Sequence, residues 1–193
     1  MKLTLIRHGK VDMKYEKAYD SASFDVAQAG YDAADIYPVP QEAVDPVLKD
    51  AILPKGDAPR LKFYVSTLSR TRQTLKGLYG GVPYTETPLL KEVPLVACKD
   101  TDKRLPRSFW RAAGRVQWFL NKSRQPEVRA ATKARAEELV QMLMEKNEDA
   151  VLVTHEFYLY TLIHVLRRHG FQVSRPQKTR FRINNLEHIY AEI

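Results

Sequence analysis

Short apolar runs alternate with stretches of helical periodicity along this chain of 193 residues. The runs at 3–6 and 150–153 consist largely of aliphatic and β-branched residues, which is typical of parallel strands buried on both faces. Similar runs lie near residue 62 and at the end of the chain. Helical patterns are predicted at 25–36, 70–78, 108–120, 127–146 and 157–169. This alternation predicts an α/β fold, a three-layer sandwich in which helices cover both faces of a mainly parallel sheet.

Polar residues follow two of the apolar runs directly. Arg7-His8-Gly9 ends the first run, and Thr154-His155 ends the run at 150–153. Ligands of open α/β sheets bind outside the carboxyl ends of the strands, so both histidines open onto one crevice if their strands are neighbours. An imidazole can attack phosphorus, an arginine holds phosphoryl oxygens in a planar fork, and a glycine lets the backbone approach an anion. The combination predicts phosphoryl chemistry.

A third segment, residues 61–74, adds two more cations. Residues 63–65 are a predicted strand, the hydroxyls of residues 66–69 are suited to capping a helix, and Arg70 lies in its first turn. A cation there costs about 0.3–1 kcal/mol against the helix dipole unless an anion is bound nearby. We therefore expect Arg70 to face a bound phosphate, whereas Arg72 is equally well placed to point into water.

These segments resemble the histidine phosphatase superfamily, branch 1, which has the phosphoglycerate mutase-like fold. The likeness rests on Arg7-His8-Gly9, on Ser-x-x-x-Arg-x-x-x-Thr at residues 66–74, on the acidic Glu92 and on Thr154-His155, in that order along nearly the whole chain. Residues 28–34 are similar to the Gly-x-x-x-Ala helix start of the family, and residues 183–186 resemble its last strand.

The resemblance implies a covalent mechanism. His8 would be the nucleophile and form a phosphohistidine that water hydrolyses. Arg7, Arg70 and His155 would hold the phosphoryl oxygens around it and stabilise the charge that moves during transfer. His8 has to be neutral for this role, and nearby arginines favour its neutral form.

Two carboxyl groups are candidates for the general acid that protonates the leaving group. Glu92 stands close to the position of the acid in the phosphoglycerate mutase-like branch, and Glu156 stands where the acid-phosphatase branch carries an aspartate. We favour Glu92, because the apolar residues at 89–90 and 93–95 can bury one side of its carboxyl. The alternative for Glu156 is a glutamate that only complements the start of a helix.

Three functions are therefore open. The favoured one is a phosphatase of the histidine acid type, a phosphoric monoester hydrolase acting on a small anionic phosphorylated substrate. The second is a phosphomutase of the phosphoglycerate mutase type, and the third is a non-catalytic module that binds phosphate or a polyanion. The substrate and the oligomeric state do not follow from the sequence.

Composition and charge add expectations about the domain organisation and the ligands. With 44% apolar residues, residues 1–193 are expected to form a single domain, with loops at 38–59 and 85–106 over the sheet edge. The net charge of +8 favours anionic ligands. Trp110 and Trp118, among the basic residues of 103–135, are arranged so that they could stack a nucleobase. The favoured alternative is an amphipathic helix with solvated arginines. Its buried stripe would consist of Phe109, Ala113, Val116 and Leu120.

The remaining expectations are negative ones. No signal peptide or membrane-spanning run is apparent, the single Cys98 excludes an internal disulfide, and a cytoplasmic protein without membrane contact is expected. Nothing in the sequence requires a metal or another cofactor. Binding to nucleic acid is the less favoured interpretation of the basic segment at 103–135.

Overall fold

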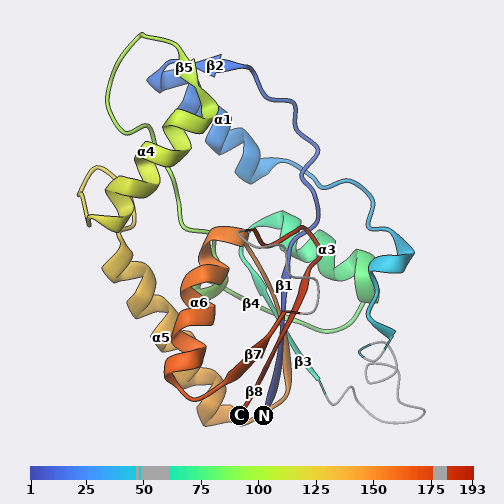
Figure 1. Ribbon diagram of the computed structural model, residues 1–193. Coiled ribbons are helices and arrows are strands. Elements are labelled where there is room, and N and C mark those ends of the chain that lie inside the picture. The colour runs from blue at the N-terminus through green and yellow to red at the C-terminus, as the bar shows by residue number, and fades with distance from the viewer. Residues whose placement is uncertain (47, 49–60, 176–181) are drawn as a thin grey trace.

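A six-stranded mixed sheet with the order β4-β3-β6-β1-β8-β7 forms the centre of the computed structural model, which describes residues 1–46, 48, 61–175 and 182–193 (Figure 1). Four neighbouring strands are parallel: β4 (Thr85–Thr87), β3 (Lys62–Ser66), β6 (Ala150–Thr154) and β1 (Lys2–Arg7). Two strands complete the sheet with antiparallel pairing: β8 (His188–Glu192) beside β1, and β7 (Gln172–Ser174) beside β8. The predicted α/β class is confirmed, with an antiparallel edge added to the parallel strands.

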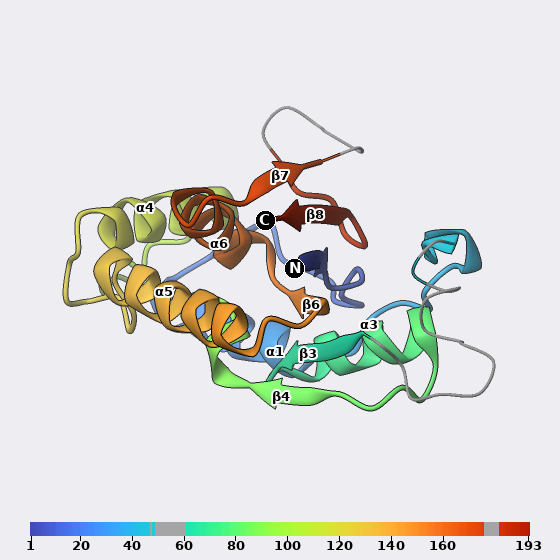
Figure 2. The same ribbon diagram turned by 90° about the horizontal axis from the view of Figure 1, so that it is seen from below.

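Helices cover both faces of this sheet. On one face lies α3 (Ser69–Tyr79), and on the other lie α5 (Arg129–Lys146) and α6 (Glu156–Arg168) (Figure 2). Side chains of β1 alternate between the two faces, so Leu3 and Leu5 belong to the core under α5 and α6, while Ile6 belongs to the core under α3. Because successive side chains point to opposite faces, the strands supply apolar residues to both cores and helices pack on both faces of the sheet.

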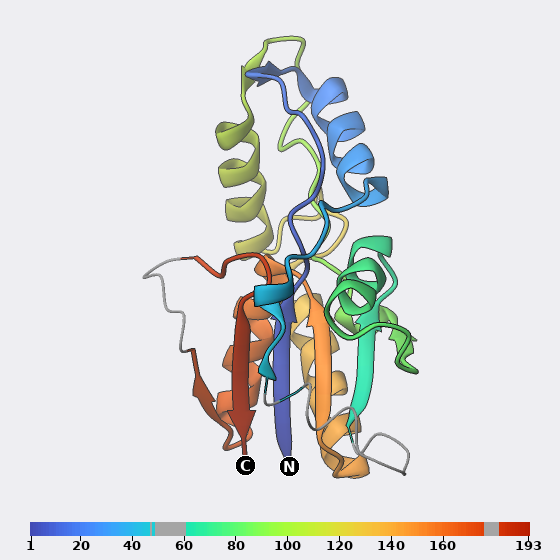
Figure 3. The same cartoon turned by 90° about the vertical axis from the view of Figure 1, so that its right-hand side faces the viewer.

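A lobe stands beyond the carboxyl ends of the parallel strands (Figure 3). It consists of α1 (Ser21–Ala33), α4 (Arg107–Phe119) and a small antiparallel pair, β2 (Ala18–Tyr19) with β5 (Leu105–Pro106). We call these four elements the cap. The cap has its own core of buried side chains: Tyr19, Phe24, Leu95, Ala97 and Trp110. The chain termini lie together at the opposite end of the sheet (Figure 3).

The first helix begins earlier than predicted. Asp20 accepts a hydrogen bond from the Ser23 backbone N–H at 2.8 Å, and the Ser23 side chain completes a capping box, so α1 starts at Ser21. Residues 28–34 therefore end this helix and do not start it, which corrects the expectation taken from the family resemblance.

The expectation for the last strand and two loop predictions also need correction. Residues 183–186 precede the last strand, because Leu186 adopts a left-handed turn with φ 61° before β8 begins. Residues 85–106 include β4, the 3-10 helix η2 (Pro88–Leu90) and β5. Of the predicted loop at 38–59, the described part holds the 3-10 helix η1 (Gln41–Ala43), and residues 47 and 49–59 lie outside the described residues.

The buried stripe of α4 was predicted on the wrong side of the helix. Trp110, Gly114 and Trp118 are buried, whereas Phe109, Val116 and Leu120 of the predicted stripe are exposed. The glycine explains the choice of face, since a Cβ at Gly114 would lie 2.5 Å from Leu95 Cδ1, so only glycine allows this close packing.

The two tryptophans are not available as a stacking platform. The Trp110 indole N–H donates to Tyr19 O at 2.9 Å, and the Trp118 indole N–H donates to Thr132 Oγ1 at 2.9 Å. Because both rings are buried in the cores, the suggested stacking of a nucleobase on them is wrong. Among the described residues, none of the helices combines the length and the hydropathy of a transmembrane span.

Candidate active site

The ends of three parallel strands bring the candidate residues together. In the sheet register Arg7 of β1 lies beside Thr154 of β6, and Val65 of β3 lies beside Val153. The residues that follow these positions therefore lie at the same edge of the sheet: His8, His155 and Ser66. The two imidazole centroids are 5.1 Å apart, so the neighbouring strands do bring the two histidines together at this edge.

His8 is held in a single orientation and tautomer. Its backbone N–H donates to Thr154 O at 2.9 Å, and its backbone carbonyl accepts from Asn185 Nδ2 at 2.8 Å. The ring Nδ1 lies 2.7 Å from Gly9 O, and because a carbonyl only accepts, Nδ1 carries the proton. The lone pair of neutral His8 is therefore on Nε2.

The surroundings of His8 keep it neutral. Burial lowers the pKa of His8 well below its usual value, and the positive charges of Arg70 and Arg7 lower it further. The Gly9 hydrogen bond acts in the opposite direction and is the weaker influence. A neutral imidazole with a free Nε2 is the form in which histidine is a nucleophile.

Gly9 contributes close packing at this turn. A Cβ at Gly9 would lie 2.8 Å from Ile36 Cδ1, and the Gly9 N–H donates to Thr74 Oγ1 at 2.8 Å. The glycine thus lets the first turn pass against Ile36, a reason that the sequence pattern did not indicate.

His155 contacts protein atoms through both ring nitrogens. Its Nδ1 accepts from Arg70 Nε at 3.2 Å, so the proton is on Nε2, which lies 2.8 Å from Ser66 Oγ. Burial lowers the pKa of His155 well below its usual value, followed by the effects of His8 and Arg70. In this arrangement His155 orients Arg70, and direct contact of His155 with phosphate stays a prediction.

Arg70 is fully buried, as the argument from the helix dipole predicted for a residue facing inward. Its Nη1 pairs with Asp32 Oδ1 at 3.0 Å, and its guanidinium lies 4.8 Å from the centroid of the Tyr31 ring. Sequence reasoning did not single out Asp32 or Tyr31, because they lie at the end of α1, far from the strand ends that carried the signal. Arg72, by contrast, reaches out of the site and pairs with Glu86 at 2.7 Å.

Buried donors of two guanidinium groups lack acceptors. Arg7 donates through Nη1 to Ile183 O and pairs through Nη2 with Glu156 Oε2 at 3.1 Å. Among the described residues, Arg7 Nε and Arg70 Nη2 have no hydrogen-bond partner although both atoms are buried. Since buried N–H groups are almost always satisfied, these two donors are the ones that we expect a phosphate at His8 to satisfy.

The hydroxyls of residues 66–69 do not cap α3, which corrects that prediction. The residue before the helix is Leu68, and no side chain accepts a bond from the first turn. The Ser66 hydroxyl contacts His155, and the Thr71 hydroxyl donates to Ser66 O at 2.9 Å. In the first turn, the Thr71 N–H donates instead to the backbone carbonyl of Leu68 at 3.0 Å.

Glu92 follows η2 in the chain, and its carboxylate lies against the N-terminal end of α6. Its Oε1 accepts from the Tyr158 N–H at 3.0 Å and from the Val93 N–H at 2.9 Å, and its Oε2 accepts from the Phe157 N–H at 3.4 Å. Leu90 and Val93 are buried on either side of it, as predicted from the apolar flanks. Glu92 is thus fixed by backbone donors and faces the cleft described below.

Glu156 lies at the start of a helix, as predicted, and it also forms ion pairs. It is the first residue of α6, but its carboxylate lies between two arginines, with Arg7 Nη2 at 3.1 Å and Arg182 Nε at 3.6 Å. Glu156 thus balances the charge of Arg7 in addition to its place at the helix start, and whether it takes part in catalysis stays a prediction.

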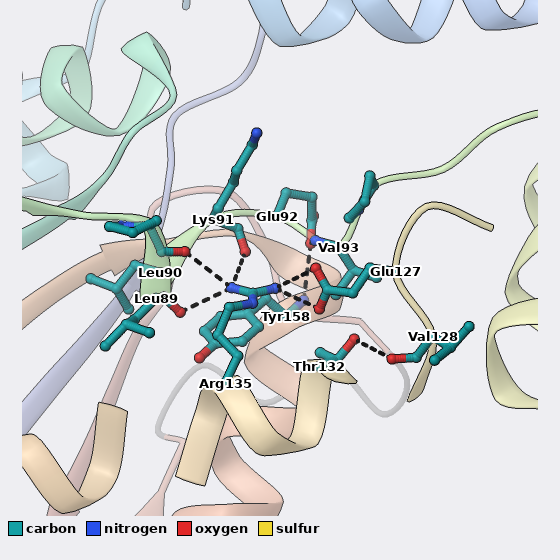
Figure 4. A network of polar contacts seen from close by, with 12 residues as sticks. Leu89, Leu90, Lys91, Glu92, Val93, Glu127, Val128, Thr132, Arg135 and Tyr158 are labelled. Carbon is teal, nitrogen blue, oxygen red and sulfur yellow. Dashed lines mark hydrogen bonds and ion pairs between the residues drawn. The ribbon is translucent and has the colours of Figure 1, made fainter. Parts of the chain in front are cut away.

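Arg135 holds the chain segment that carries Glu92 (Figure 4). Its Nη1 donates to Leu89 O at 2.9 Å and to Lys91 O at 2.8 Å, while its Nη2 pairs with Glu127 at 2.9 Å. The guanidinium also lies 4.3 Å from the centroid of the Tyr158 ring. The sequence offered no signal for this network, since the acceptors are mostly backbone carbonyls.

A cleft of about 970 Å³ lies between the sheet edge and the cap. Its walls include Arg7, His8, Glu92 and Glu156, together with residues of α1 and α4. This volume suits a small ligand. In the described ranges no group of three or more His, Cys, Asp or Glu side chains is placed to hold a metal ion.

Comparison with known proteins identifies the family. The profile of the histidine phosphatase superfamily (branch 1) matches residues 50–191, and the chain belongs to this superfamily. The matched part leaves out β1 and the Arg7-His8 turn, which the structure places against it. No curated protein matches the chain in sequence.

Solved structures share the fold at low sequence identity. A phosphoserine phosphatase from Entamoeba histolytica in complex with 3-phosphoglyceric acid is similar with a TM-score of 0.57 and 18% identity, over 98% of this chain and 89% of the other. A putative α-ribazole-5′-P phosphatase from Escherichia coli gives a TM-score of 0.57 and 19% identity, over 100% of this chain and 91% of the other. The phosphoglycerate mutase-like fold is thereby confirmed.

Proposed function

We propose that this protein is a phosphatase of the histidine acid type that hydrolyses phosphate monoesters through a phosphohistidine on Nε2 of His8. The observation that carries the proposal is the pair of buried, unsatisfied guanidinium donors on Arg7 and Arg70 beside a neutral imidazole. Membership of the superfamily supports it, as do the names of the two similar proteins, both phosphatases. The predicted cytoplasmic location stays a prediction.

The first chemical step is phosphoryl transfer to the enzyme. The lone pair on His8 Nε2 attacks phosphorus, a P–N bond forms, and the bond between phosphorus and the ester oxygen breaks. Arg7 Nε and Arg70 Nη2 donate to the phosphoryl oxygens and stabilise their charge. Glu92, entering this step protonated, gives its proton to the leaving oxygen and becomes a carboxylate.

The second step returns the enzyme to its starting state. A water molecule loses a proton to the Glu92 carboxylate and attacks phosphorus as the P–N bond breaks. Inorganic phosphate leaves, His8 recovers its lone pair, and Glu92 is protonated again. We favour Glu92 over Glu156 for this task, because Glu156 forms ion pairs with Arg7 and Arg182, whereas the partners of Glu92 are neutral backbone N–H groups.

Turnover of p-nitrophenyl phosphate tests the nucleophile. We expect His8→Ala to reduce kcat by about a thousandfold or more, since the covalent route is lost. His164→Ala is the matched control, because His164 is an exposed histidine on α6, and it should keep the wild-type rate. A His8→Ala protein that is folded and turns over at the wild-type rate would remove His8 from the mechanism.

Single-turnover formation of the phosphoenzyme tests the acid. With an alkyl phosphate, whose leaving group needs a proton, Glu92→Gln should slow the step by about 10²–10⁴-fold. If Glu92→Gln leaves the step unchanged while Glu156→Gln abolishes it, Glu156 is the acid and our assignment is wrong.

A further inference from the structure

A ladder of arginines on α4 faces the cleft from the side of the cap. Arg107, Arg111 and Arg115 follow one another at intervals of four, which places them on one face of the helix, and all three line the cleft. Like charges at this spacing repel, and the first turn of α4 contains no acidic residue to offset them. This arrangement is unfavourable unless an anion binds between the arginines.

Arg107 and Arg111 differ from the other arginines of the cleft. Arg107 is half-buried with its guanidinium 3.7 Å from the centroid of the Tyr15 ring, and the side chain of neither arginine bonds to an acceptor in the described part of the chain. Burial lowers the pKa of Arg107 first of all, and Arg111 lowers it further. The groups that act on Arg107 are tyrosines and Arg111, and no carboxylate is among them.

Arg115, the third member of the ladder, is already bound within the protein. Its Nη2 donates to Val93 O at 3.1 Å, and its guanidinium lies 3.7 Å from the centroid of the Phe157 ring. Burial lowers the pKa of Arg115 to about 10. We therefore assign Arg115 to the wall of the cleft and leave Arg107 and Arg111 as the pair that can bind a ligand.

Each acidic residue of the cleft has a partner other than Arg107 and Arg111. Asp25 accepts from the Ala97 N–H at 2.7 Å, Asp32 pairs with Arg70, Glu92 accepts backbone N–H groups, and Glu156 pairs with Arg7. The cleft is also lined by more basic than acidic residues, with Lys10, Lys91 and Arg182 in addition to the arginines above. On the cap, Arg107 and Arg111 have no ion-pair partner among the described residues.

From this juxtaposition we propose that Arg107 and Arg111 form a subsite for a second oxyanion of the substrate. The substrate is then a small phosphomonoester that carries another phosphate or a carboxylate, with the scissile phosphate at His8. The proposal rests on the proposed function for the position of the first phosphate. Guanidinium groups bind both kinds of oxyanion through charge-assisted hydrogen bonds, so the two sources are separated by experiment.

Binding to the His8→Ala protein tests the subsite without relying on turnover. Isothermal titration calorimetry compares two matched pairs of ligands: 3-phosphoglycerate with glycerol 3-phosphate, and fructose 1,6-bisphosphate with fructose 6-phosphate. In each pair the first ligand carries the second oxyanion. We expect at least one pair to show tighter binding of the two-anion ligand, and the pair that does so identifies carboxylate or phosphate.

Removal of the arginine charges then locates the effect. In Arg107→Gln/Arg111→Gln, the preference for the two-anion ligand should fall by about 10- to 100-fold, the effect expected for loss of a charged hydrogen bond. Arg129→Gln removes one charge outside the cleft, where Arg129 lies over the Phe119 ring at 4.4 Å, and should retain the preference. Circular dichroism checks that both variants fold.

Other results overturn the proposal. Equal binding within both pairs, absence of binding by either two-anion ligand, or an equal loss in Arg129→Gln would show that no subsite exists at Arg107 and Arg111. If His8→Ala does not fold, the same titrations are made with His8→Gln or with the wild-type protein by competition. Failure of the proposed function has a different signature, namely turnover that persists without His8.

Discussion

Replacement of Arg135 by methionine tests how the structure positions the proposed acid. The substitution keeps an unbranched side chain but removes the donors to Leu89 O and Lys91 O and the ion pair with Glu127. These contacts hold the segment that leads to Glu92 (Figure 4). Arg135 is therefore a positioning residue, with effects on both stability and catalysis.

The expected loss of stability follows from the burial of the pair. The side chains of Arg135 and Glu127 are 16% and 18% exposed, so the substitution leaves a largely buried carboxylate without its partner. Breaking such a pair costs about 3–5 kcal/mol. Because a domain is stabilised by about 5–15 kcal/mol, Arg135→Met should fold but unfold at clearly lower denaturant concentration.

Leaving-group dependence separates the catalytic effect from simple destabilisation. If the segment holding Glu92 moves, kcat for an alkyl phosphate should fall about tenfold more than kcat for p-nitrophenyl phosphate, whose leaving group needs no proton. The double variant Arg135→Met/Glu127→Gln is the control. It removes the unpaired carboxylate and should recover part of the stability while the kinetic defect persists.

Two results would refute this reasoning. An unchanged ratio of the two kcat values in a folded Arg135→Met protein would show that Glu92 does not depend on Arg135 or does not act as the acid. Recovery of that ratio together with stability in the double variant would show that the kinetic defect only reflects partial unfolding.

Further predictions concern the neutral histidines and the packing of the cap. Burial lowers the pKa of His8 and His155, so below about pH 6.5 the unfolded chain binds more protons than the folded protein. The contribution of these histidines to stability should therefore be complete above that pH and fall as the pH drops. The free energy of unfolding should decrease by at most about 1.4 kcal/mol per pH unit for each histidine. Denaturant titrations from about pH 7.5 to pH 5 measure this slope, which His155→Gln should reduce; a slope of zero or of opposite sign in the wild type would contradict the expectation. In the cap, Gly114→Ala should cost about 1–3 kcal/mol because its Cβ would lie 2.5 Å from Leu95 Cδ1, whereas Gly81→Ala, with nothing within 4 Å of its Cβ, should leave Tm unchanged; equal Tm values for the two variants would contradict the packing seen here.

The sequence predicted the parts of the site that depend on strand ends. His8 and His155 follow buried apolar runs, and parallel strands present their carboxyl ends at one edge, so the two residues were expected to meet if their strands were neighbours, which the sheet register shows. The inward position of Arg70 followed from the cost of a cation at a helix start. These predictions rest on rules that act over a few residues.

Other features depend on packing between distant segments and left no local pattern. The carbonyl contacts of Arg135 need the backbone path of residues 88–92, and the pairing of Asp32 with Arg70 needs the end of α1 to lie over α3. The buried face of α4 was predicted wrongly because its apolar residues occupy more than one face, and the decisive residue was Gly114.

Trapping of the covalent intermediate tests the central claim most directly. A rapid-quench reaction with a ³²P-labelled phosphate monoester, kept at alkaline pH, should give a base-stable and acid-labile phosphoenzyme in the wild type. Peptide mapping and NMR of the isolated phosphohistidine should then place phosphorus on Nε2 of His8, since Nδ1 holds the proton shared with Gly9 O. Turnover with phosphorus on Nδ1, on another residue or on no residue at all would contradict the account.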